Sequence, residues 1–333
     1  MRTKTPAWLL KFPSAAVVIL IMMVICTVAS DKYLTLGNIV NIIQQNAVLL
    51  IVALGATLVL LTEGIDLSLG SVVSLSGINS VIVMIYMSKL GLPNGAAMLL
   101  GVLAGLLTGV LMGAITGGLV AIGKLPPFIA SLGTMGIGAA LALVFGNSSA
   151  IYIDNPVFVF FGQKLDRFTH IDVLQYVSMP TVMAVIMFII VWVILYHTSF
   201  GRNIIAIGGN ESGARLSGIR TISTKWMVYI LSGTLASIGG MILAARIQAA
   251  DSSVGLGMEF NAIAAAIIGG TSFLKGKGGI AGTILGVLVI GVTLNGMNVL
   301  AVPTFYQPVI IGTVIILAIV FEVILSRWKE AHK

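Results

Sequence analysis

The residue types that usually carry catalysis are scattered in this chain. Its three histidines are His170, His197 and His332. None of them has a Cys, Asp or Glu at the spacing of a metal site, and the single cysteine, Cys26, excludes a disulfide framework. Residues Gly118–Lys124 nearly match a phosphate-binding loop, but Leu125 stands where Ser or Thr must hold magnesium. We therefore expect no enzyme activity, no metal, no cofactor and no ATP hydrolysis by this chain alone.

Side-chain amides inside apolar segments are a stronger functional signal. They are Gln44, Gln45, Asn46, Asn79, Asn295 and Asn298. A polar group in lipid is unfavourable unless it finds a hydrogen-bond partner or lines a route for a solute. Neutral amides can replace the hydrogen bonds that water makes to a sugar, whereas they suit a naked ion poorly. The pattern predicts a translocation path for a neutral polar solute, and hydrogen bonding between helices is the alternative.

The composition places these amides in a membrane protein. Of 333 residues, 58% are hydrophobic and 9% are charged, whereas about a quarter of residues are charged in soluble domains. Apolar runs of about twenty residues recur, which predicts an all-α integral membrane protein with about ten transmembrane helices. The predicted spans are residues 14–30, 38–62, 67–87, 96–122, 128–146, 174–196, 226–245, 259–274, 280–300 and 304–326.

The basic residues indicate which side of the membrane each loop occupies. With the N-terminus inside, 13 of the 18 Lys and Arg residues fall in interior segments and 5 fall outside, as the positive-inside rule requires. The net charge of +7 therefore reflects the lipid membrane and not a nucleic acid partner. We predict cytoplasmic termini, with span 14–30 retained and not cleaved as a signal peptide. The eighth span is short and carries Glu259 and Asn261, so we expect it to be tilted or partly re-entrant.

Two polar segments interrupt the spans: a cytoplasmic segment, residues 197–225, and an external loop, residues 147–173. In the cytoplasmic segment Asn210 is a good helix N-cap and Glu211 lies in the first turn, where the helix dipole favours an anion. Gly218 is a natural helix stop. Such a short capped helix is suited to docking another protein, and a solvated connector is the alternative. The external loop could receive a partner or be plainly solvated.

The spacing of glycines and two short recurring segments at the starts of spans, here called joints, indicate how the helices are arranged. The fourth span carries a glycine at every fourth position: Gly101, Gly105, Gly109, Gly113 and Gly117. This smooth face predicts close packing within the subunit, with a dimer contact as the alternative. The joint Asp66–Gly70 recurs as Asp251–Gly255, and Pro126–Phe128 recurs as Pro303–Phe305. Because the members of each pair lie on opposite sides of the membrane, the sequence favours two five-helix halves of inverted orientation.

Three stretches of the chain resemble the permease subunits of bacterial ABC importers for monosaccharides. They are Glu63–Ser71, Gly201–Ile219 and Asn261–Gly286, and they occur in the family's order over nearly the whole chain. The resemblance implies a single transmembrane permease domain over residues 1–333 in a bacterial inner membrane. It implies cytoplasmic ATPase subunits, a periplasmic sugar-binding protein, and a second permease copy or a similar permease in a dimer.

The resemblance also assigns roles to residues. It implies that the short cytoplasmic helix is the coupling helix that docks on the ATPase, with matches at Asn210, Glu211, Ala214, Arg215 and Gly218. The family motif of the first stretch is matched at Glu63, Asp66, Ser68 and Gly70. Gly213 stands inside the coupling helix, where glycine is about 1 kcal/mol less favourable than alanine.

The resemblance leaves the solute open. Permeases for ribose, xylose, galactose and arabinose fit it, as do close relatives for autoinducer-2 and, more loosely, for nucleosides. A stand-alone secondary carrier is a different class of protein. The sequence opposes it, because no chain of Lys, His or carboxylate residues forms a proton relay inside the spans. We therefore expect import of a ribose-like pentose or hexose, driven by ATP hydrolysis on a separate chain.

Overall fold

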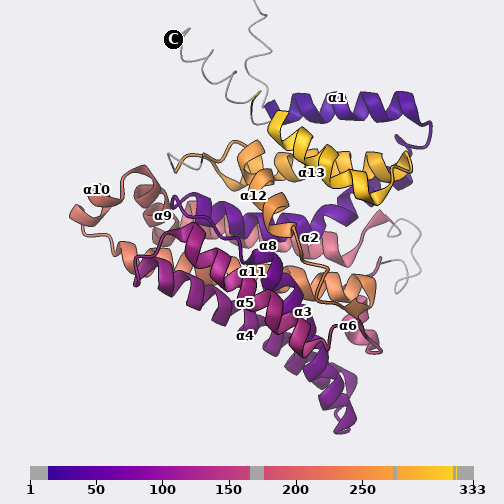
Figure 1. Cartoon of the computed structure of the whole chain (residues 1–333), viewed down its shortest axis with the longest axis horizontal. Helices are drawn as coiled ribbons and strands as arrows, with labels where there is room; N and C mark the ends of the chain where they lie inside the picture. The colour runs from indigo at the N-terminus through magenta and orange to yellow at the C-terminus, as the bar shows by residue number, and fades with distance from the viewer. Residues whose placement is uncertain (1–13, 166–175, 273–275, 318–319, 321–333) are drawn as a thin grey trace, which may run out of the picture.

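The chain folds into a helical bundle, shown in Figure 1. The computed structural model describes residues 14–165, 176–272, 276–317 and 320. The helices of this part are α1 (Ser14–Ala29), α2 (Leu36–Leu60), α3 (Leu69–Lys89), α4 (Asn94–Ala121), α5 (Pro127–Phe145), α6 (Pro156–Phe160), α8 (Met179–His197), α9 (Ser199–Gly209), α10 (Glu211–Leu216), α11 (Thr221–Ile247), α12 (Met258–Ile268) and α13 (Ile280–Val299). A last apolar helix over Thr304–Leu317 begins with the 3-10 turn η2 (Thr304–Tyr306). Strands β1 (Ile151–Tyr152) and β2 (Ala249–Ala250) pair antiparallel.

Each predicted span coincides with a helix. Among the described residues, α2, α3, α4, α5, α8, α11 and α13 are long and apolar enough to cross a membrane. The first, eighth and tenth spans coincide with shorter apolar helices, and the end of the tenth span lies outside the described residues. The helix α12 has 11 residues and therefore reaches about 16 Å, half of a hydrocarbon core of about 30 Å. It cannot cross as a helix by itself, in agreement with a tilted or partly re-entrant eighth span.

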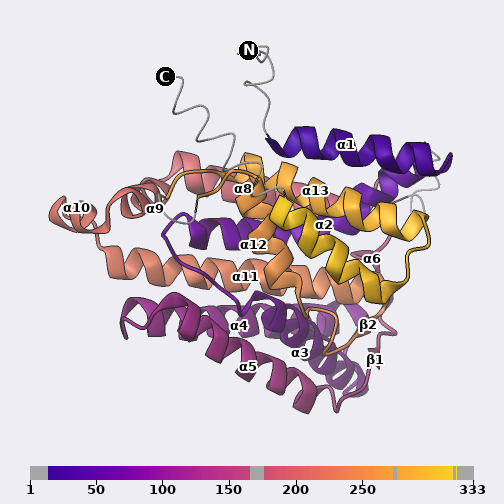
Figure 2. The same ribbon diagram turned by 45° about the horizontal axis from the view of Figure 1, so that its top comes forward.

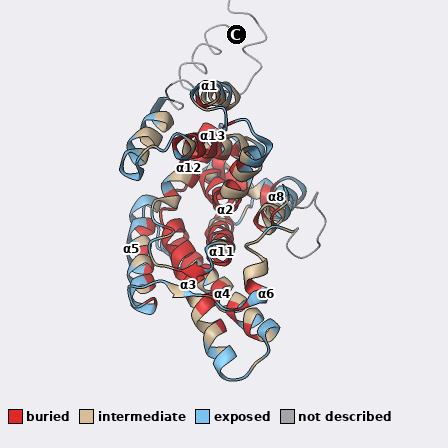
Figure 3. Ribbon diagram, turned by 90° about the vertical axis from the view of Figure 1, so that its right-hand side faces the viewer, coloured by how far each residue is buried: buried red, intermediate tan, exposed pale blue. Residues whose placement is uncertain are grey.

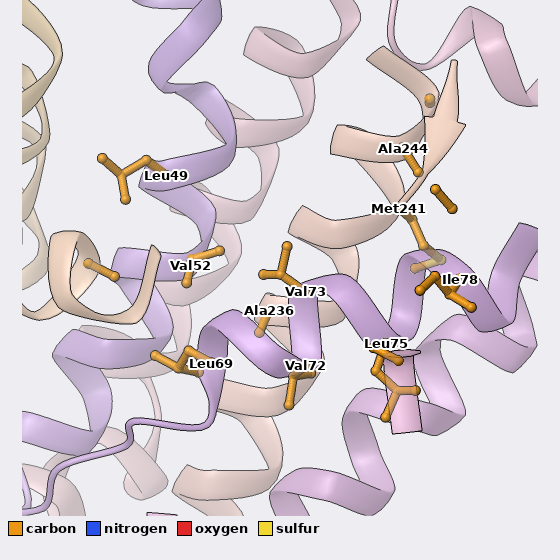
Figure 4. Close-up of a cluster of buried hydrophobic side chains, with 14 of the residues drawn as sticks. Leu49, Val52, Leu69, Val72, Val73, Leu75, Ile78, Ala236, Met241 and Ala244 are labelled. Carbon is orange, nitrogen blue, oxygen red and sulfur yellow. The ribbon is translucent and has the colours of Figure 1, made fainter. Parts of the chain in front are cut away.

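The core lies where α11 packs against α2, α3 and α4. Figure 4 shows one cluster of buried side chains in it, with Leu49 and Val52 from α2, Val73 from α3, and Ala236 and Met241 from α11. Figure 3 shows the consequence for the whole bundle: buried residues concentrate in α2, α3 and α11, whereas α5 and α8 carry many exposed ones. These outer helices must face lipid or another chain.

The two faces of α4 explain its position. A Cβ atom on Gly109 or Gly113 would overlap a backbone carbonyl oxygen of α11, that of Gly233 or Tyr229 respectively. The opposite face carries exposed aliphatic side chains at every fourth position: Leu99, Leu103, Leu107, Leu111, Ile115 and Leu119. The glycine face is therefore buried within the subunit and the leucine face is suited to lipid. The predicted intrasubunit packing is confirmed.

Segments that were predicted on the same side of the membrane meet in the structure. On the external side, β1 belongs to the loop 147–173 and pairs with β2, which follows α11. On the cytoplasmic side, Gly208 of α9 packs against the backbone of Leu61 and Gly276. Figure 2 shows α10 and the two strands at opposite ends of the bundle. This grouping agrees with the predicted topology.

The cytoplasmic segment contains more helix than the sequence predicted. One short helix was expected in residues 197–225, whereas the structure has both α9 and α10, and α11 begins inside the segment. The Oγ1 atom of Thr198 accepts a hydrogen bond from the Gly201 amide (3.2 Å) and caps α9. Ile204 and Ile207 are then buried on one face. The sequence did not predict α9, because these two isoleucines stand among polar residues and the amphipathic pattern is short.

Candidate functional site

The helix α10 is fixed by caps at both ends. The Oδ1 atom of Asn210 accepts a hydrogen bond from the Gly213 amide (2.9 Å), which satisfies a free donor of the first turn. At the other end Gly218 has a φ angle of +85°, and the Ile219 amide donates to the carbonyl oxygen of Ala214 (3.1 Å). This is the Schellman arrangement that glycine favours after a helix. The predicted cap and stop are confirmed.

One face of α10 is tied to the bundle and its tip is free. Glu211 forms an ion pair of 2.5 Å with Lys225 in the first turns of α11. Arg215 lies one turn after Glu211, as the spacing indicated, but the carboxylate pairs with α11. Ala214 is buried, whereas the side chain of Leu216 is 91% exposed. The tip of α10 thus presents one large apolar side chain to its surroundings.

An open cleft of about 540 Å³ lies beside α10. It is lined by Val120, Ala121, Lys124, Glu211, Ser212, Arg215, Leu216, Ile222 and Lys225. These residues come from the end of α4 and the loop after it, from α10, and from the start of α11. Three cations and one carboxylate line it, and the carboxylate is already paired. The cleft therefore offers an electropositive recess next to the exposed tip.

The six predicted path amides do not gather on one surface. Asn295 of α13 and Asn38 of α2 exchange two hydrogen bonds of 2.9 Å. Asn79 of α3 donates to the Thr108 hydroxyl of α4 (2.9 Å), and Asn46 donates to a backbone carbonyl of its own helix. Asn295 and Asn79 therefore hydrogen bond between helices, which is the alternative that the sequence left open, whereas Asn46 bonds within its own helix.

The remaining amides differ from one another. Gln45 donates to the Asn41 side chain (3.0 Å), and Asn298, at the exposed end of α13, accepts from Gln307 (3.0 Å). The Nε2 atom of Gln44 is buried and has no hydrogen-bond partner among the described residues. A buried donor without a partner is unfavourable, so Gln44 is the amide of this set whose side chain is best suited to a solute.

The family motif folds into a loop that enters the bundle between α2 and α3. Asp66 is 1% exposed. Its Oδ1 atom accepts hydrogen bonds from the Ser68 amide (3.0 Å) and hydroxyl (2.6 Å), and its Oδ2 atom accepts one from Ser232 of α11 (3.3 Å). Burial raises the pKa of the Asp66 carboxyl group, and the hydrogen bonds from Ser68 and Ser232 oppose that shift. The motif thus anchors the start of α3 to α11.

The recurring joint has the same local structure. The Oδ1 atom of Asp251 accepts hydrogen bonds from the Ser253 amide (2.7 Å) and hydroxyl (2.6 Å). These bonds lower the pKa of Asp251, which is partly exposed. The same two hydrogen bonds in both Asp-x-Ser turns support the predicted repeat. Sequence reasoning missed Ser74 and noted Glu259 only as a charge in the short eighth span, although each follows the Asp of its own joint by eight residues.

The helix α5 has an exposed face with small residues. Gly133, Gly136 and Ala140 lie on it, and a Cβ atom on either glycine would meet no atom within 4 Å. Larger side chains such as Leu132 and Ile137 flank them. This face differs from the leucine face of α4, because the absence of large side chains at these positions leaves room for the close approach of another helix.

Comparisons with known proteins agree with one another. A sequence profile of the family described as branched-chain amino acid transport system / permease component matches residues 38–319. The ribose import permease protein of Escherichia coli K12 is 39% identical over 321 residues, 96% of this chain and 95% of that protein. That of Bacillus subtilis 168 is 41% identical over 313 residues, 93% and 91% of the two chains. The D-allose transport system permease protein of Escherichia coli K12 is 35% identical over 318 residues, 95% and 93% of the two chains. No solved structure matches.

Proposed function

The chain belongs to the family of permease components of branched-chain amino acid transport systems, and on this premise we propose that it carries ribose or a similar monosaccharide. It is a multi-pass inner-membrane permease subunit of an ATP-binding-cassette importer and not an enzyme. The proposal of ribose as the solute rests on the identity of 39% and 41% with two ribose import permeases over more than nine tenths of the chain. A permease for autoinducer-2 or for a nucleoside is the alternative.

The proposed partners are cytoplasmic ATPase subunits, a periplasmic sugar-binding protein and a second permease copy or a similar permease. The contact with the ATPase is assigned to α10. Its caps make it a rigid projection, its ion pair ties it to α11, and its tip exposes Leu216 beside an electropositive cleft. We propose that the partner covers Leu216 with an apolar surface and meets the cations of the cleft with acidic side chains.

Exchange of Leu216 for serine tests this contact. We expect L216S to lower the affinity for the host's ATPase subunit roughly tenfold, because removal of a central interface side chain often costs about 1.4 kcal/mol or more. Copurification and ATP-dependent uptake in vesicles measure it. The matched control is L90S, an exposed leucine in the external loop between α3 and α4. Equal loss of ATPase binding in both variants would contradict the assignment.

The solute is tested by uptake into vesicles that contain the host's ATPase and binding protein. Labelled ribose, xylose, galactose, allose, autoinducer-2, adenosine and leucine form the panel. We expect saturable ATP-dependent uptake of ribose or of another monosaccharide, and none of leucine. Uptake of adenosine or autoinducer-2 alone would establish the alternative. Accumulation of any solute without the ATPase would overturn the proposed function itself.

The lining of the path follows from which groups remain unsatisfied. We propose that Gln44 lines the translocation path. The wider set of candidates for this lining is Gln45, Asn46, Asn79, Asn295 and Asn298. Gln44 has the strongest support because its buried donor has no partner among the described residues. A sugar hydroxyl passing this atom would supply the missing acceptor.

A further inference from the structure

The two recurring joints touch each other inside the bundle. Gly70 lies in the first turn of α3, and Gly255 lies just before α12. A Cβ atom on Gly70 would overlap the carbonyl oxygen of Gly255, and a Cβ atom on Gly255 would overlap the carbonyl oxygen of Gly70. Each glycine follows the Asp of its joint by four residues. Equivalent positions of the two predicted halves therefore meet backbone to backbone.

The side chains one turn further on complete a reciprocal contact. Ser74 follows Gly70 by four residues, and its hydroxyl accepts a hydrogen bond from the Gly255 amide (2.9 Å). Glu259 follows Gly255 by four residues, and a Cβ atom on Gly70 would overlap its Oε2 atom. Both side chains are buried, Ser74 at 2% and Glu259 at 4% exposure. We call these four residues the crossing.

The two polar side chains of the crossing, Ser74 and Glu259, differ in their hydrogen bonding. Ser74 makes its hydrogen bond, whereas the Oε2 atom of Glu259 has no hydrogen-bond partner among the described residues. Its Oε1 atom accepts a long bond from the Gly257 amide (3.3 Å). Oε2 and the carbonyl oxygen of Gly255 both lie where a Gly70 Cβ atom would be, so two acceptors face one small gap. The crossing is closely packed, but this side of it is unfavourable.

A continuous set of contacts joins the crossing to α10. Glu211 of α10 pairs with Lys225 of α11. Further along α11, Ser232 bonds Asp66, which holds the loop before α3 and thereby Gly70. A displacement of α10 can therefore reach the crossing along one rigid helix and one buried carboxylate.

We propose that the crossing is the contact that opens and closes between the two halves during transport, and that Glu259 is a positioning residue that keeps it reversible. The proposal rests on the proposed function, because it needs a permease that alternates between states. Glycine backbones can separate and return without interlocking side chains. The unpaired carboxylate raises the free energy of the closed contact, so that a modest displacement at α10 suffices to open it.

The variant E259Q separates this role from a merely structural one. Its amide nitrogen can take the place of Oε2 and donate to the Gly255 carbonyl, so the closed crossing gains a hydrogen bond. We expect a higher melting temperature together with a maximal uptake rate lowered roughly two- to tenfold, the range of one added hydrogen bond. A residue that only supports the fold would lose stability and rate together. The control is D31N, which also replaces a carboxyl group by an amide but lies on an exposed loop.

Opening itself is measured at Ser74. In a Cys26→Ala background, S74C places a thiol at a position that is buried in this structure. We expect a water-soluble thiol reagent to label it slowly at rest and faster during ATP turnover, and E259Q to suppress the increase. A labelling rate that ATP turnover does not change would overturn the proposal, as would E259Q that melts lower or transports like the native chain. Because labelling needs no known solute, a wrong sugar assignment leaves this result interpretable.

Discussion

Asp66 acts at the scale of single hydrogen bonds. It accepts three of them while 1% exposed, and they fix the loop before α3 against α11. Asp251 makes the same two bonds to Ser253 in a partly exposed position. The two turns make the same bonds to their serines, so we expect their contributions to the free energy of unfolding to differ because of burial. Donors left unpaired in a buried site lose their full hydration, whereas water replaces the partner at an exposed site.

Alanine at the two positions tests this difference. We expect D66A to lower the free energy of unfolding by about 2–3 kcal/mol, and D251A by less than about 1 kcal/mol, because only the first leaves buried donors unpaired. Thermal unfolding of the detergent-solubilised protein measures both. Equal destabilisation by the two variants would show that burial does not decide the contribution of the turn.

Gln44 provides a second test at the residue scale. Exchange for leucine removes a buried donor that lacks a partner, so Q44L is expected to stabilise the fold by about 1 kcal/mol. If the amide meets the solute, the KM for uptake rises at the same time. N79L is the matched variant, because it breaks the bond to Thr108 and should destabilise the fold instead. A stabilised Q44L protein with native KM would remove Gln44 from the path.

At the scale of elements, α4 shows how small residues set helix distance. A methyl group on Gly113 would overlap the backbone of Tyr229, so α4 and α11 would have to separate. We expect G113A to destabilise the fold by about 1–3 kcal/mol, as overpacking does. G95A lies on the same helix with no atom within 4 Å of its Cβ position and should be neutral. Thermal unfolding of both variants would refute this account if their melting temperatures matched.

Local chemistry explains which elements the sequence could predict. The spans follow from length and apolarity, and the ends of α10 follow from Asn210 and Gly218, whose caps depend on neighbouring residues alone. The partners of the amides were harder to predict, because no residue near Asn295 in the sequence indicates that it faces Asn38 of a distant span. Spans that are apolar on every side have little periodicity to indicate which face is inward. The bond from Ser232 to Asp66 and the contact of Glu259 with Gly70 therefore required the tertiary structure.

At the scale of the whole molecule, the surface divides into two kinds of apolar face. The aliphatic side of α4 resembles the lipid that would surround it. The exposed side of α5 is different, since Gly133 and Gly136 leave backbone open beside Leu132 and Ile137. Open backbone is suited to the close approach of another helix. We therefore propose this side of α5 as the contact with the second permease, and in a two-fold dimer equivalent residues near the axis meet each other.

Cysteine cross-linking tests that contact in the membrane. In a Cys26→Ala background, G136C is expected to form a disulfide between two copies on mild oxidation, because Gly136 is open and lies on the proposed seam. L107C, on the lipid-facing side of α4, is also at an exposed position and should stay monomeric. Denaturing gels without reductant measure both. Dimers that form through L107C and not through G136C would move the seam to α4. If the partner is a similar permease instead of a second copy, G136C cross-links only when that partner carries a matching cysteine.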